Sequence, residues 1–98
     1  MLEISAVEPL HGRVVRLTLS DGSVVERDLG DLLDGHGVFA RITTDDSAFR
    51  EVYVDYGTLA WPGDVDLAPE TLIWDGPTPH DWATRSPEPL LRPRLPPR

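Results

Sequence analysis

The sequence contains no cysteine among its 98 residues. This absence excludes a disulfide scaffold, catalysis by a thiol and any zinc site built on thiolate ligands. No apolar run approaches the roughly 20 residues that a membrane-spanning helix needs. The N-terminal residues also lack the basic and apolar regions of a secretory signal. We therefore expect a cytoplasmic protein.

Lysine is absent too, so nine arginines face seventeen acidic residues and the net charge is −8. DNA phosphates repel such a chain, and the counterion release that drives non-specific DNA binding is missing. Residues 1–74 carry 14 acidic and 5 basic side chains, whereas residues 75–98 carry 3 acidic and 4 basic. Nucleic acid is therefore an unfavourable partner for the acidic part of the chain.

Proline is scarce in most of the chain but common near its end. Seven of the ten prolines lie in residues 77–97, where they favour extended chain and exclude regular helices. A chain of this length forms one domain at most. The sequence thus predicts a small acidic α+β domain over residues 1–74 and a flexible tail containing proline and arginine over residues 75–98.

Alternation and turn signals predict the elements of the domain. Strands are expected at residues 2–6, 14–20 and 23–29, a second hairpin at 52–61, and an extended segment at 65–67. Short helical segments are expected at residues 30–35, 38–42, 46–51 (with Asp45 as N-cap) and 68–72. Together they predict an α+β fold with an antiparallel sheet of about five strands and the helices of residues 30–51 on one face.

The register of the first hairpin can be predicted from the sequence. A two-residue loop would place Glu26 and Asp28 on the apolar face, which is costly. A three-residue loop at residues 20–22 instead pairs Leu17 with Val25. This loop requires Gly22 in the left-handed region of backbone conformation.

Several segments resemble a small bacterial family, domain of unknown function 2442. The resemblance is carried by Gly-Thr-Leu-Ala-Trp-Pro at residues 57–62 and Asp-Leu-Ala-Pro-Glu-Thr-Leu at residues 66–72. Similar segments earlier in the chain are residues 19–24, 28–29, 31–33, 38–39 and 45–49. The resemblance covers about residues 2–74.

The resemblance implies a small α+β fold with an antiparallel sheet and no established activity. Some members of that family are followed by a helix-turn-helix domain, and others are encoded beside a small protein in a pair similar to a toxin–antitoxin module. After residue 74 this chain has no room for three helices. Of these two roles, the resemblance therefore supports the binding of a partner protein.

Two groups of side chains could hold a metal ion. Asp31, Asp34 and His36 offer oxygen and imidazole ligands, but a solvated helix end followed by a glycine-flanked loop explains them better, because only one histidine is present. Asp64 and Asp66 would point to the same side of a strand and could share a cation or act as acid and base. Their alternative roles are a turn residue and a helix cap. Because no catalytic arrangement or phosphate-binding loop is found, we expect neither an enzyme nor a cofactor.

Three tryptophans are candidate contact residues, because tryptophan is enriched at interface hot spots. Trp61 ends a predicted strand and would most often pack on the core, whereas Trp74 and Trp82 lie at or beyond the edge of the domain. The tail arginines could touch nucleic acid or an acidic protein; these are Arg85, Arg92, Arg94 and Arg98.

The sequence therefore favours a non-catalytic protein-interaction module, an antitoxin-like partner of a small protein encoded by a neighbouring gene. The alternative is a transcriptional or nucleic-acid-binding regulator. A small metal-dependent hydrolase using Asp64, Asp66 and His36 ranks last. The edge strands of a small sheet could also pair into a homodimer.

Overall fold

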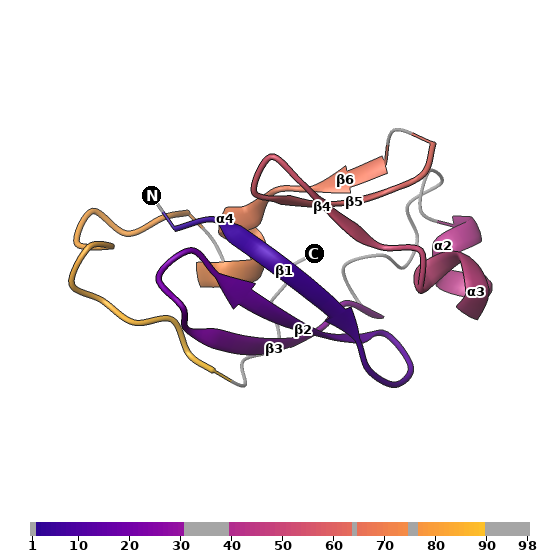
Figure 1. Cartoon of the computed structure of the whole chain (residues 1–98), viewed down its shortest axis with the longest axis horizontal. Helices are drawn as coiled ribbons and strands as arrows, with labels where there is room; N and C mark the ends of the chain where they lie inside the picture. The colour runs from indigo at the N-terminus through magenta and orange to yellow at the C-terminus, as the bar shows by residue number, and fades with distance from the viewer. Residues whose placement is uncertain (1, 31–39, 64, 75–76, 90–98) are drawn as a thin grey trace, which may run out of the picture.

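The computed structural model describes residues 2–30, 40–63, 65–74 and 77–89. Within these ranges, six strands form two three-stranded antiparallel sheets in the orders β1-β2-β3 and β4-β5-β6 (Figure 1). The strands are β1 (Ile4–Pro9), β2 (Val14–Leu19), β3 (Val24–Asp28), β4 (Tyr53–Asp55), β5 (Thr58–Trp61) and β6 (Val65–Leu67). The helices are α2 (Ala40–Thr44), α3 (Asp46–Phe49) and α4 (Pro69–Trp74). None of the described helices is long and apolar enough to cross a membrane.

The predicted register of the first hairpin is confirmed. Leu17 pairs with Val25, and the Leu19 amide donates to the Ser23 carbonyl across the three-residue loop. Gly22 has the expected positive φ of 88°. Ser23 donates to the Asp21 carboxylate from both its hydroxyl (2.6 Å) and its amide (2.9 Å), and these bonds lower the pKa of Asp21.

The substitution Gly22→Val should lower the free energy of unfolding by about 1–2 kcal/mol, because a β-branched residue is strained at positive φ. No atom lies within 4 Å of a Cβ built at Gly22, so the loss would come from the backbone alone. Gly22→Asn is the matched control and should cost less, since asparagine tolerates this conformation. Urea denaturation measures the free energy of unfolding of both variants. Equal stability of Gly22→Val and the parent would contradict the placement of Gly22 at positive φ in a three-residue loop.

The first strand differs from its prediction in phase and extent. A β-bulge interrupts its register between Ile4 and Ala6, so Ile4 is buried while Ala6 is exposed. The hydroxyl of Ser5, between them, donates to the Thr18 carbonyl at 3.1 Å. The strand then continues to Pro9, because the outer edge of a sheet tolerates a residue that lacks an amide hydrogen.

The prediction of a single sheet of about five strands is wrong: among the described residues there are two separate sheets. The second hairpin forms as predicted, and the extended segment after it becomes β6 by pairing with β5. Leu59 of β5 and Leu17 of β2 belong to one buried cluster. The packing of side chains in the core, rather than a continuous ladder of backbone hydrogen bonds, therefore joins the two sheets. The Ile4 amide donates to the Gly57 carbonyl at 3.1 Å where they meet.

The short helices depend on side-chain caps and on the core. Asp45 is the N-cap of α3, as predicted, and accepts a hydrogen bond from the Ala48 amide at 3.3 Å. Pro69 occupies the first position of α4, where its missing amide costs nothing. The predicted helix of residues 30–35 lies almost wholly outside the described residues.

One hydrophobic cluster fills the space between the sheets and the helices. Its buried members are Ile4, Val15, Leu17, Leu19, Val25, Leu29, Ile42, Phe49, Leu59, Trp61, Leu72 and Ile73. Arg27 is buried with them at 1% exposure, and its guanidinium donates to the carbonyls of Leu72 and Ile73 at the end of α4. Sequence reasoning did not anticipate a core arginine.

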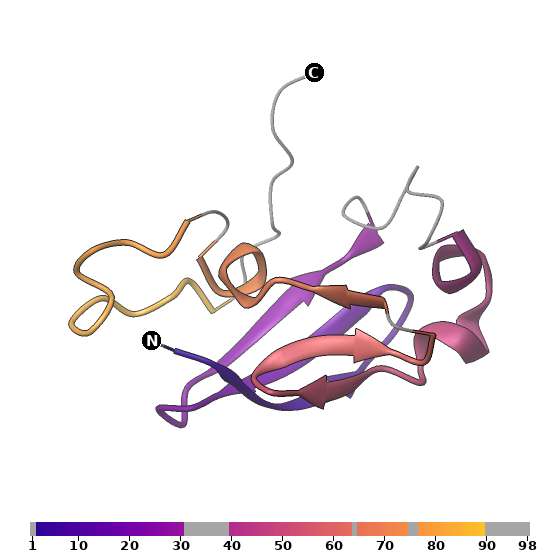
Figure 2. The same cartoon turned by 90° about the horizontal axis from the view of Figure 1, so that it is seen from above.

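The C-terminal segment was predicted to be a flexible tail. Its described part, residues 77–89, forms a turn at 80–84 and returns to β3 (Figures 1 and 2). There the Glu26 amide donates to the Pro89 carbonyl at 2.7 Å, and Pro87 is buried. Both views place this segment at the opposite end of the sheets from α2 and α3. The flexibility of the tail stays a prediction.

Candidate functional site

The three tryptophans occupy different environments. Trp61 is 1% exposed, its ring centroid lies 6.2 Å from that of Phe49, and its indole nitrogen donates to the Phe49 carbonyl at 3.0 Å. This is the core position that its place in the strand favoured, and it leaves no surface for the partner contact also considered. Trp74 and Trp82 are half-buried, so each presents part of its ring to solvent.

The candidate metal ligands are only partly placed by the structure. Asp31, Asp34, His36 and Asp64 lie outside the described residues. Asp66 is exposed in the middle of β6, opposite Ala60, rather than at the start of α4 where a helix cap would lie. Among the described residues, no three His, Asp or Glu side chains are gathered as a metal site requires.

The outer face of the second sheet is the most distinctive surface in the described part of the chain. Tyr53, Ala60 and Asp66 are aligned across its three strands, and Asp55 lies opposite Thr58 in the next row. Leu59 and Trp61, at the alternate positions of β5, are buried in the core, so these five residues lie on the opposite side of the sheet. There Tyr53, Asp55 and Asp66 are exposed, whereas Ala60 between them is buried at 5% exposure. With Tyr56 at the adjoining turn, the five residues are called here the tyrosine–carboxylate face.

Among the described residues, the charge of this face is not balanced. The strands β4, β5 and β6 contribute no arginine, and Asp55 and Asp66 take part in no ion pair among the described residues. The outer face of the first sheet is different. There Glu8, Arg16 and Glu26 lie in register across three strands, with Arg16 nitrogens 2.9 Å and 3.3 Å from the two carboxylates.

The remaining described arginines are also engaged inside the domain. Arg13 contacts Asp46 (3.2 Å), Arg41 contacts Glu51 (3.9 Å), Arg50 donates to the Leu10 carbonyl (3.1 Å), and Arg85 contacts Asp81 (3.2 Å). Arg13 also lies 5.0 Å from the centre of the Phe49 ring. Because these cations are occupied by internal partners, the two carboxylates of the tyrosine–carboxylate face are available to an external cation.

Tyr56 is held in an unfavourable conformation for a tyrosine. It occupies the first position of the two-residue turn between β4 and β5 with φ 49°, and Gly57 follows with φ 80°. Such turns favour asparagine or glycine at both positions. The Tyr56 side chain is 98% exposed, so intramolecular packing does not compensate for the strain. A bulky residue in this conformation points to a function for the exposed ring.

Replacement of Tyr56 should therefore stabilise the isolated domain. Tyr56→Asn is expected to raise the free energy of unfolding by about 0.5–1 kcal/mol, because asparagine adopts the left-handed region at lower cost. No buried contact is lost, since the ring is exposed. Chemical denaturation measures the change, and a destabilised Tyr56→Asn variant would show that the ring supports the fold.

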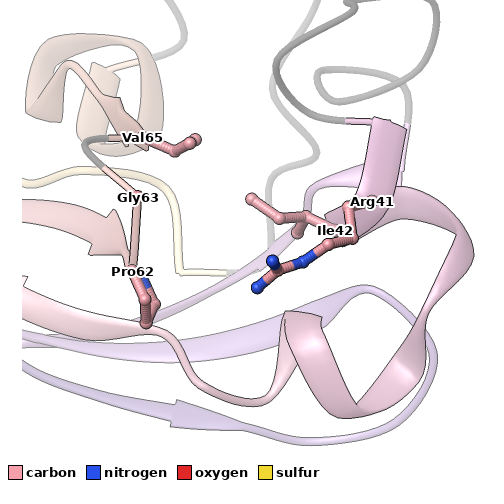
Figure 3. A pocket seen from close by; sticks show the side chains of 5 residues that line it. All are labelled: Arg41, Ile42, Pro62, Gly63 and Val65. Atoms are coloured by element: carbon pink, nitrogen blue, oxygen red, sulfur yellow. The ribbon is translucent and has the colours of Figure 1, made fainter.

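A small hollow lies between α2 and the end of β5 (Figure 3). Arg41, Ile42, Pro62, Gly63 and Val65 line its volume of about 190 Å³, and the side chains of Ile42 and Val65 face each other across it. The volume is below the roughly 300–1,000 Å³ of typical ligand pockets. The hollow therefore suits a single side chain better than a cofactor.

Sequence reasoning singled out Asp66 but missed Tyr53, Asp55 and Tyr56. A signal was present in the Tyr56-Gly57 turn, because an aromatic residue replaces the asparagine or aspartate that such a turn favours. The alignment of Tyr53 with Asp66 was not predictable, since it depends on β6 joining the second hairpin.

Comparison with known proteins gives a family and one structural likeness. The model of a family described as protein of unknown function, DUF2442, matches residues 4–76. No curated protein matches the sequence significantly. A crystal structure of a putative DNA-binding protein from Nitrosomonas europaea is similar, with 34% identity and a TM-score of 0.58. The similarity covers 64% of this chain and 41% of that chain, so the chain spans less than half the length of this relative.

Proposed function

Since the chain belongs to DUF2442, a family of proteins of unknown function, we propose that it is a non-catalytic protein-interaction module. The tyrosine–carboxylate face binds a small basic protein. In this two-protein pair, the present chain is the acidic, antitoxin-like member. The domain serves as a scaffold that presents this face, and no covalent chemistry is required of it.

The observation that supports this proposal is the uncompensated charge beside exposed aromatic rings. Asp55 and Asp66 lack ion pairs among the described residues, while Tyr53 and Tyr56 are 45% and 98% exposed. Tyrosine supplies a large, rigid contact area at interfaces, and its ring attracts arginine and lysine. Carboxylates beside such rings steer a basic partner to the face and fix its orientation.

The test begins with the tagged chain purified from its native host, with the neighbouring gene product co-expressed and bound proteins identified by mass spectrometry. We expect a small basic protein in stoichiometric amount. With the purified pair, the double variant Asp55→Arg and Asp66→Arg should bind at least about tenfold more weakly, a loss of about 1.4 kcal/mol. Higher salt should weaken the parent complex, because its charges lie near the surface.

The matched control is Glu88→Arg, which reverses an exposed carboxylate outside the face. Its affinity should stay close to that of the parent. Recovery of the chain alone from the host would count against an interaction module. Equal weakening by Glu88→Arg and by either single replacement, Asp55→Arg or Asp66→Arg, would show that net charge, rather than this face, directs binding.

A nucleic-acid-binding regulator is the second candidate function, and the similar structure from Nitrosomonas europaea is the observation that favours it. The charge of −8 and the internal engagement of the described arginines oppose it. A gel-shift assay with random duplex DNA at low salt separates the two candidates. Retention of DNA at micromolar protein would favour the regulator, and no retention would leave the interaction module.

A further inference from the structure

The strand β3 forms one edge of the first sheet. The backbone of β3 alternates between bonds to β2 and groups that point outward. The Leu19 amide donates to the Ser23 carbonyl, and the Leu29 amide donates to the Arg13 carbonyl, each at 2.8 Å. Odd-numbered residues of β3 therefore bond to β2, and Glu26 directs both its amide and its carbonyl away from the sheet.

The two outward groups of Glu26 have different partners. Its amide donates to the Pro89 carbonyl at 2.7 Å, so the C-terminal segment supplies the acceptor. Its carbonyl accepts a hydrogen bond from Arg27 Nη1 at 2.8 Å. The same guanidinium is anchored on the carbonyls of Leu72 and Ile73, which holds it in place over the edge.

At Glu26 the edge therefore offers an incoming chain a backbone donor but no free backbone acceptor. An ordinary strand needs both, because its own amide must find a carbonyl when it pairs. Proline has a carbonyl and no amide hydrogen, so an extended proline-rich segment satisfies the edge and leaves no donor unpaired. We propose that the β3 edge is a docking site for an extended proline-rich segment of a partner protein, occupied in this chain by residues 87–89.

The internal segment is suited to displacement. Only one backbone hydrogen bond joins residues 77–89 to β3 in the described structure, between Glu26 and Pro89. Thr78 Oγ1 and Asp81 Oδ1 are buried without a hydrogen-bond partner among the described residues. Burial of unpaired polar atoms opposes docking of the segment. A partner lacking these two groups can therefore compete, although the covalent link gives the internal segment a high effective concentration.

A second copy of the chain is a poorer occupant of this edge. Antiparallel pairing of two β3 strands about Glu26 would bring the two Glu26 side chains opposite each other, and like charges directly opposite are destabilising. The Glu26 carbonyl is also already engaged by Arg27. The site lies on a different sheet from the tyrosine–carboxylate face, so this inference does not depend on the proposed function.

The test uses the full chain and measures hydrogen exchange of the Glu26 amide by NMR. Pro87 is buried and Glu88 is exposed, so Pro87→Asp should release the segment while Glu88→Gln should retain it. We expect Pro87→Asp to accelerate exchange at Glu26 by about tenfold or more. Exchange at Leu17 and Leu19 in β2 should not change, which shows that the sheet is intact. Should Pro87→Asp disturb β2, the milder Pro87→Ala takes its place.

The released variant is then titrated with a synthetic peptide of residues 83–89. This peptide should restore slow exchange at Glu26, whereas the same peptide carrying Pro87→Ala and Pro89→Ala should not do so at equal concentration. Three results would overturn the proposal: unchanged Glu26 exchange on release, no effect of the peptide at millimolar concentration, or equal effects of the two peptides. A dimer of the released variant in analytical ultracentrifugation would also overturn it, because a second copy would then be the occupant.

Discussion

Trp61→Ala should lower the free energy of unfolding by about 3–5 kcal/mol, the cost of removing a large aromatic side chain from a core. Trp61 is 1% exposed and belongs to the buried cluster that joins the two sheets. Its loss also leaves the Phe49 carbonyl without the indole hydrogen bond. Total stabilities of about 5–15 kcal/mol are typical, and a small domain lies near the lower end. Urea denaturation followed by circular dichroism should therefore show a largely unfolded protein at low urea.

Two further variants separate the causes of that loss. Trp61→Phe keeps an aromatic ring and removes the hydrogen bond, so it should cost less than Trp61→Ala. Trp82→Ala removes a half-buried ring from the C-terminal segment and should have a much smaller effect. If Trp61→Ala and Trp82→Ala proved equally destabilising, the placement of the core around Trp61 would be wrong.

Arg27→Met should lower the free energy of unfolding by about 2–5 kcal/mol, although methionine fits the apolar surroundings. The guanidinium of Arg27 donates to the carbonyls of Leu72 and Ile73 at the C-terminal end of α4. Both residues are buried, and each carbonyl that loses its partner costs about 1–3 kcal/mol. A positive charge at this end also favours the helix dipole. Thermal and urea denaturation measure the loss.

The matched control is Arg16→Met on the outer face of the same sheet. Arg16 forms two ion pairs, but its side chain is 45% exposed, and such pairs contribute only about 0–1 kcal/mol. The loss of stability caused by Arg27→Lys should lie between those of Arg16→Met and Arg27→Met. Lysine keeps the positive charge but lacks the planar guanidinium that reaches several carbonyls. A loss of stability in Arg16→Met equal to that in Arg27→Met would contradict the core role of Arg27.

The two proposed binding surfaces recognise their partners in different ways: one uses side chains and the other uses the backbone. The tyrosine–carboxylate face offers rings and carboxylates, so its partner is selected by charge and aromatic contact. The β3 edge offers the Glu26 amide, so its partner is selected by a carbonyl that needs no neighbouring amide. A partner that carries both a basic surface and a proline-rich segment could use the two surfaces together.

Local chemistry allowed the sequence to predict the hairpins and one helix cap. The loop at residues 20–22 set the pairing of Leu17 with Val25, because the alternative register would bury two carboxylates. Asp45 was predictable as an N-cap, since its side chain satisfies an amide only a few residues away. In each case the deciding interaction lies within one hairpin or one helical turn, so neighbouring residues contain the necessary information.

Tertiary packing decided the division into two sheets, the burial of Arg27 and the composition of the tyrosine–carboxylate face. Residue 27 lies on the buried side of β3, but only the end of α4, 45 residues later, supplies the carbonyls that make arginine acceptable there. Tyr53 and Asp66 share a face because β6 pairs with β5. These features depend on which distant elements pack together, and that choice is made by the shape of the whole core, which no local pattern of residues specifies.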